Sequence, residues 1–131
     1  MSLGFLAPFQ DRIYALMRIV VGFLFFCHGL QKVFGLLGGT QANTALMGVG
    51  GIIELVGGAM IAAGFMTGIA AFLASGMMAV GYFMAHQSKG ALPIQNGGEL
   101  AVAYAWVFLY LAAKGSGTWS VDATRKGGGG S

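Results

Sequence analysis

The feature that most constrains the fold is a stretch of 34 residues, 55–88, without a single Asp, Glu, Lys or Arg. One continuous helix of this length would extend roughly 50 Å at about 1.5 Å per residue, whereas the hydrocarbon core of a bilayer is about 30 Å thick. The stretch is therefore predicted to cross a membrane twice, with a turn where Gly64 and Gly68 bracket three residues.

The composition leads to the same conclusion. Charged residues make up 8% of the 131 residues and hydrophobic residues 56%, whereas a soluble domain is about a quarter charged. Seven basic and four acidic residues cannot cover the surface of a water-soluble fold of this size. A soluble enzyme and a nucleic-acid-binding protein are therefore excluded. The single cysteine, Cys27, excludes an internal disulfide framework.

Four membrane spans are predicted, because about 20 apolar residues in a helix cross a bilayer. Their short connections predict an all-α fold, a four-transmembrane-helix bundle with both termini on one side. This single domain covers residues 1–126, and the Gly-rich residues 127–131 are interpreted as a linker or tag remnant. The predicted spans are about residues 13–34, 47–65, 68–85 and 98–114.

The basic residues predict the orientation of the bundle. Cytoplasmic ends of membrane spans carry an excess of Lys and Arg. Five basic residues lie on the side of the termini and two on the opposite side, so both termini are predicted to be cytoplasmic. The first set is Arg12, Arg18, Lys114, Arg125 and Lys126, and the second is Lys32 and Lys89.

Several titratable side chains are predicted to lie at membrane depth toward the outer side, where each needs a partner or a function. His28 and Lys32 are four residues apart and share one helix face. Glu54 enters about 10 Å from the outer side, the depth of His28, and is expected to pair with Lys32 or His28 or to be protonated because it is desolvated. A structural ion pair and a proton-handling or ligand-binding carboxylate both fit this pattern. His86 and Glu99 complete the outer group.

Alternative interpretations apply to the remaining polar residues. The spacing of Asn96 and Glu99 is typical of a helix N-cap and its reciprocal carboxylate. His86 can be an ordinary interfacial residue. Arg18 can extend to the inner headgroups, or pair with Asp122 and hold the C-terminal segment under the bundle. Two His and two Glu could bind a metal, and two His a haem, but neither has a diagnostic spacing, so no metal site is predicted.

Five short motifs follow one another along nearly the whole chain before residue 127. In their order and spacing they resemble the DoxX-like family of small four-helix membrane proteins. Val121 replaces the Leu that is frequent in the last motif. The motifs are Arg18 with Gly22, His28-Gly29-x-x-Lys32, Glu54 with Gly57-Gly58, Asn96-Gly97-Gly98-Glu99, and Gly115-x-Gly117-x-x-Ser120-Val121-Asp122.

The resemblance implies a prokaryotic plasma-membrane protein linked to redox metabolism. The family is named for a membrane subunit linked to thiosulfate:quinone oxidoreductase, and other members are associated with thiol-redox or oxidative-stress partners. It leaves open whether this chain is itself catalytic, what its redox partner protein is, and whether it forms a homo-oligomer.

The leading hypothesis is therefore a redox-linked membrane subunit that binds a quinone or meets the electron path of a thiol/thiosulfate:quinone oxidoreductase partner. Quinone reduction consumes protons as well as electrons, which suits a carboxylate and an imidazole beside an apolar slot. Glu54 and His28 are the candidate catalytic residues. Aromatic side chains could line the slot, namely Phe25, Phe26, Phe83 and Trp106. The candidate binding residues are Lys32, His86, Glu99 and Arg18.

Two further hypotheses differ in class. A small-molecule binding or transport protein could use the same polar recess for an anionic ligand, although no proline interrupts a predicted span. A non-catalytic scaffold would use the polar residues only to fix the register of its helices.

Overall fold

The computed structural model describes residues 3–39 and 41–125, so the predicted linker at 127–131 lies outside the described residues. The described chain consists of helices and their connections. The elements are η1 (Ala7–Phe9), α1 (Gln10–Phe34), α2 (Ala45–Ala63), α3 (Thr67–Ala85), η2 (Gln87–Lys89), α4 (Pro93–Asn96), α5 (Glu99–Lys114) and α6 (Val121–Arg125).

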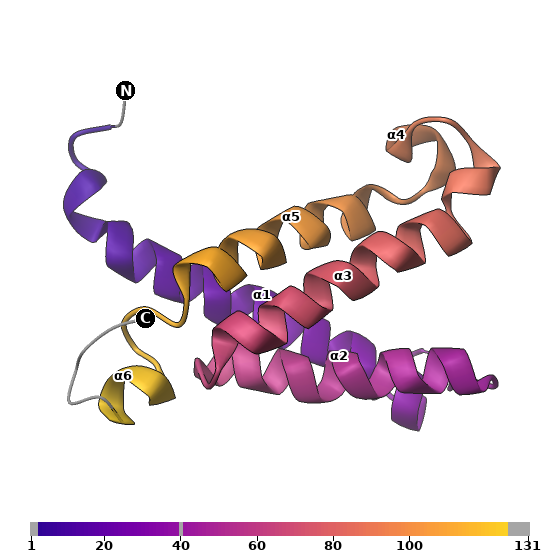
Figure 1. Ribbon diagram of the computed structural model, residues 1–131, viewed down its shortest axis with the longest axis horizontal. Helices are drawn as coiled ribbons and strands as arrows, with labels where there is room; N and C mark the ends of the chain where they lie inside the picture. Colours follow the sequence, from indigo (N-terminus) through magenta and orange to yellow (C-terminus); the bar gives the residue numbers. More distant parts are fainter. Residues whose placement is uncertain (1–2, 40, 126–131) are drawn as a thin grey trace.

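The four long helices form two antiparallel pairs, α1 with α2 and α3 with α5 (Figure 1). The helices η1 and α6 lie at one end of the molecule, which we call the terminal end. The opposite end, which carries α4, is called the distal end. The two pairs diverge toward the distal end in Figure 1.

Three of the described helical segments are long and apolar enough to cross a membrane, namely Ala7–Phe34, Ala45–Ala63 and Thr67–Lys89. Their central parts match the first three predicted spans within a few residues. The fourth predicted span corresponds to α5, which has 16 residues and extends about 24 Å. The molecule is thus an all-helical, multi-pass membrane protein. Large apolar side chains of α3, such as Phe72 and Leu73, are exposed, as lipid contact requires.

The turn between α2 and α3 follows the prediction at its first glycine. Gly64 ends α2 in the left-handed conformation, with φ of 72°, which glycine adopts without steric cost. The second left-handed residue is Met66, with φ of 49°, rather than Gly68, which lies within α3. The amide of Met66 donates a 2.8 Å hydrogen bond to Asp122 Oδ2. A contact with the C-terminal segment thus supports a conformation that the local sequence does not favour.

Glycines bring α1 and α2 into close contact. A Cβ atom added at Gly22 would lie 2.5 Å from the backbone nitrogen of Ala62, and one added at Gly29 would lie 2.6 Å from Leu55 Cα. Close backbone approach of this kind stabilises membrane helix pairs, because lipid provides no hydrophobic drive between them. The contact sets the distance between α1 and α2 along the part of the bundle that leads to the distal end.

An aromatic cluster joins the two helix pairs in the centre of the bundle. Phe25 of α1 and Phe108 of α5 are fully buried, with ring centroids 4.7 Å apart. Tyr104 stacks on Phe108 with a centroid distance of 5.4 Å. On the distal side of this cluster the pairs separate, and the candidate site lies there.

Candidate functional site

A cavity of about 260 Å³, which we call the distal cavity, lies between the two helix pairs near the distal end. Its apolar lining includes the rings of Phe25 and Tyr104. Its charged and imidazole side chains come from α1, α2 and the end of α3, namely His28, Lys32, Glu54 and His86. The structure therefore brings together four of the six candidate site residues. Their catalytic and binding roles stay predictions.

The polar centre of the cavity is an ion pair between α1 and α2. Lys32 Nζ lies 2.6 Å from Glu54 Oε1. Glu54 has a side chain that is only 2% exposed, whereas that of Lys32 is 34% exposed. The pairing of Glu54 with Lys32 predicted from helical depth is confirmed. A Cβ atom at Gly51 would lie 2.8 Å from Lys32 Cβ, so glycine at this position leaves room for the lysine stem.

The second oxygen of Glu54, Oε2, lies in a different environment. Oε2 is buried and makes no hydrogen bond to any residue that the structure describes. A buried acceptor without a donor costs about 1–3 kcal/mol, and more when it carries charge. A group that enters the cavity with an O–H or N–H donor would remove this cost.

Two histidines lie on the cavity wall in different settings. His28 is half-buried on α1, and its ring is perpendicular to that of Tyr104, with 6.2 Å between centroids. His86 follows the end of α3, where its Nδ1 lies 3.3 Å from the carbonyl oxygen of Asn96. Its ring stacks on Tyr82 at 6.3 Å. Each imidazole can donate or accept a hydrogen bond according to its tautomer.

Glu99 is exposed at the first residue of α5 and is not among the residues that line the cavity. The N-cap interpretation of Asn96 is wrong, because the N-cap of α5 is Gly98. Asn96 is buried instead, accepting a 2.9 Å hydrogen bond from the Gly98 amide and donating one of 2.9 Å to the Tyr82 hydroxyl. It thus fastens the connection between α3 and α5, a role that depends on tertiary contacts.

Arg18 lies at the terminal end, away from the cavity, and is fully buried. Its side chain does not extend to the headgroups. The guanidinium donates hydrogen bonds to backbone carbonyls of α2 and of the segment after α5. These acceptors are Ile61 at 3.0 Å, Ser116 at 2.5 Å, Thr118 at 3.0 Å, Trp119 at 2.7 Å and Ala62 at 3.4 Å. The expectation that Arg18 holds the C-terminal segment under the bundle is confirmed, and backbone carbonyl oxygens of that segment accept its hydrogen bonds.

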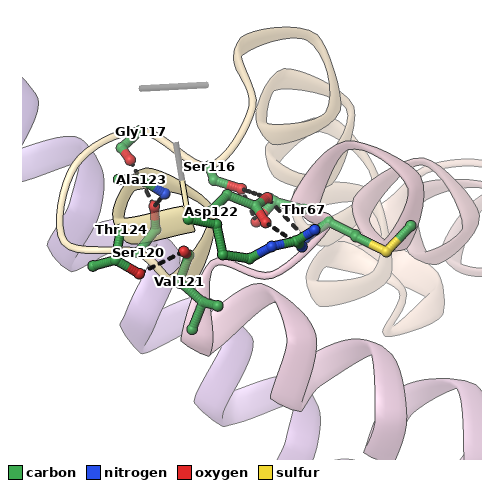
Figure 2. A network of polar contacts seen from close by, with 10 residues as sticks. Thr67, Ser116, Gly117, Ser120, Val121, Asp122, Ala123 and Thr124 are labelled. Carbon is green, nitrogen blue, oxygen red and sulfur yellow. Dashed lines mark hydrogen bonds and ion pairs between the residues drawn. The ribbon is translucent and has the colours of Figure 1, made fainter. Parts of the chain in front are cut away.

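A polar network beside Arg18 completes this attachment, and sequence reasoning did not find it (Figure 2). Ser116 Oγ lies 2.7 Å from Asp122 Oδ2 and 2.9 Å from Thr67 Oγ1. Figure 2 shows these three side chains pointing toward one another. The network links the start of α3 to the segment before α6. The polar residues after Gly115 were the available signal, but their partner Thr67 lies 49 positions earlier than Ser116.

A second hollow of about 370 Å³ lies along α3 and α5. Its lining is mostly apolar and includes Phe83 and Trp106. Of the four aromatic residues proposed to line a quinone slot, only Phe25 lines the distal cavity, whereas Phe83 and Trp106 line the second hollow. Phe26 is not among the residues that line either hollow.

No three of the described His, Cys, Asp and Glu residues are grouped closely enough to hold a metal ion. The cavity instead offers one carboxylate, one ammonium and two imidazoles around aromatic rings. This set suits a small organic molecule with a ring and polar substituents.

The comparisons with known proteins identify a family and one relative. The DoxX family model matches residues 13–87, which include His28, Lys32, Glu54 and His86 of the cavity. An uncharacterized protein of Haemophilus influenzae is 38% identical over 125 residues, covering 89% of this chain and 93% of that protein. No solved structure matches the chain significantly.

Proposed function

The chain belongs to the DoxX family of membrane proteins, and we propose that it binds a quinone-type ring in the distal cavity as the membrane subunit of a redox process. The observation that carries this proposal is Glu54 Oε2, which is buried without a hydrogen-bond partner among the described residues, on a residue that lines a cavity with aromatic rings and two imidazoles. We further propose a four-helix membrane bundle in a prokaryotic plasma membrane.

Two observations support the fourth crossing and the orientation. Helix α5 runs antiparallel to α3 (Figure 1) and carries only Glu99 and Lys114 as charged residues, one at each end. The terminal end carries Arg12, Lys114 and Arg125. This basic excess favours a cytoplasmic location for the terminal end, which places the cavity toward the outer side.

The size of the cavity suits one ring. Pockets for drug-sized ligands have about 300–1,000 Å³, so 260 Å³ accommodates a headgroup and leaves a long tail outside. Phe25 and Tyr104 offer ring faces and edges for contact. The polar groups then fix the orientation of the ring.

A bound quinone would supply reversible two-electron, two-proton chemistry. The role of this chain would be to hold the ring and to exchange protons with it. Glu54 and His28 are the proton-exchanging groups, and Lys32, which is hydrogen-bonded to Glu54 and partly exposed, connects the carboxylate with the outer surface. Electrons would come from a partner protein that oxidises a thiol or thiosulfate, since no haem or iron–sulfur motif occurs in the sequence.

Equilibrium binding of a short-chain ubiquinol, kept reduced under anaerobic conditions, to the purified full chain in lipid nanodiscs tests the proposal. We expect saturable binding that Glu54→Gln weakens at least tenfold and that Glu99→Gln, a matched change outside the cavity, leaves unchanged. Equal binding to empty nanodiscs would refute the ring site. If proteoliposomes containing the chain alone transport a solute, the transport hypothesis replaces it. If Glu54→Gln lowers only thermal stability, the scaffold hypothesis does.

A further inference from the structure

We infer that the distal cavity selects the reduced, hydroxyl-bearing form of its ring ligand, a hydroquinone or phenol, over the corresponding quinone. The inference rests on the proposed function. The inference is supported by the hydrogen-bonding capacity of Glu54 that the described residues leave unused. It adds a preference between the two redox states of the ligand, which the proposed ring site alone does not imply.

The two oxygens of Glu54 have different surroundings. Oε1 receives a hydrogen bond from the Lys32 ammonium at 2.6 Å. Oε2 has no donor within the part of the chain that the structure describes, although the side chain is 98% removed from solvent. Glu54 lines the cavity, so this unoccupied acceptor position belongs to a residue of the cavity wall.

Only a donor satisfies this position. A hydroquinone or phenol carries O–H groups and can donate a hydrogen bond to Oε2. A quinone carries carbonyl oxygens, which accept only, and placing one beside Oε2 would bring two acceptors together. Hydrogen bonds to a charged group are roughly twice as strong as neutral ones, so this contact contributes strongly to the difference between the two forms.

The other polar residues of the cavity discriminate less. His28 and His86 can each donate or accept after a change of tautomer, so either redox form finds a partner there. Lys32 donates one hydrogen bond to Glu54, and its remaining N–H groups can donate to a carbonyl or a hydroxyl oxygen, so they suit either form. A water molecule at Oε2 would strengthen the preference, because a ligand that displaces ordered water without reproducing its hydrogen bonds loses affinity.

The test compares ubiquinol-1 with ubiquinone-1, titrated anaerobically against the full chain in nanodiscs and corrected for partition into empty nanodiscs. We expect the quinol to bind at least about tenfold more tightly, a difference of 1.4 kcal/mol. In Glu54→Gln the side-chain amide offers a donor of its own, and the ratio is expected to fall to about one or to invert. Glu99→Gln should keep the wild-type ratio.

The outcomes separate the inference from the proposed function. If neither form binds the wild-type chain, the ring site itself is absent and both ideas fail. If both forms bind but the quinone binds equally or more tightly, the ring site stands and the selectivity is refuted. An unchanged ratio in folded Glu54→Gln also refutes the role of Oε2. Should that variant not fold, the wild-type ratio alone decides.

Discussion

Substituting Gly29 by alanine is expected to destabilise the bundle and to disturb the cavity at the same time. Gly29 is buried on α1, next to His28. A Cβ atom there would lie 2.6 Å from Leu55 Cα and 2.8 Å from Leu55 Cβ. Leu55 follows Glu54 directly, so any displacement at this contact is transmitted to the ion pair.

The magnitude follows from two opposing effects. Gly→Ala inside a helix contributes about 1 kcal/mol of stability through backbone entropy. Overpacking a tight contact costs about 1–3 kcal/mol, and the upper value applies here because the two nearest atoms, the nitrogen and Cα of Leu55, belong to backbone. Contact distances of 3.4 Å are ordinary and the nitrogen lies nearer than Cα, so α1 and α2 must separate by more than about 0.8 Å. The expected net loss is about 2 kcal/mol.

The matched control is Gly76→Ala on α3, where an added Cβ atom meets nothing within 4 Å. This variant gains the stability that alanine gives a helix through backbone entropy, without the steric clash, and should be about 1 kcal/mol more stable than the wild type. The assay is reversible unfolding in mixed micelles, followed by circular dichroism, together with quinol binding. The reasoning is refuted if both variants shift stability in the same direction by the same amount.

Two other variants test the remaining contacts. Lys32→Met removes the partner of a buried carboxylate and should lower the unfolding free energy by about 2 kcal/mol. Lys89→Met, at an exposed lysine, should change it by less than about 0.5 kcal/mol. Equal effects in the two variants would contradict the ion-pair account. Arg18→Lys replaces a planar group of five donors by a point charge, so trypsin should release the C-terminal segment of this variant faster than that of the control Arg12→Lys, which changes an exposed residue. Identical cleavage rates would show that Arg18 does not hold the segment.

Much of the fold was predictable because membrane thickness sets helix length. The stretch without charges at 55–88 required a turn, and Gly64 marked where α2 ends. Helical rise placed Glu54 at the depth of His28, one turn from Lys32, and so predicted a pairing with one of these two residues; the structure shows the pairing with Lys32. Depth is a one-dimensional quantity, and the sequence of a membrane helix defines it well.

The rest depends on rotation about the helix axes and on contacts between distant segments. Depth alone placed Glu99 with the outer group, yet the rotation of α5 leaves it exposed. Arg18 was visible as a residue that needs partners, but its acceptors are backbone carbonyls, and carbonyls have no sequence signature. For the same reason Asn96 was assigned to a helix cap when its partners include Tyr82 of α3.

The most direct test of the central claim, that a ring binds beside Glu54, is photo-crosslinking with a quinol carrying a photoreactive group on its ring. Mass spectrometry of the labelled chain would locate the adduct. The account predicts labelling of α1 near His28 and of α5 near Tyr104, lost when unlabelled ubiquinol is in excess. Labelling confined to the second hollow, near Phe83 and Trp106, or labelling that unlabelled ubiquinol does not reduce, would contradict it.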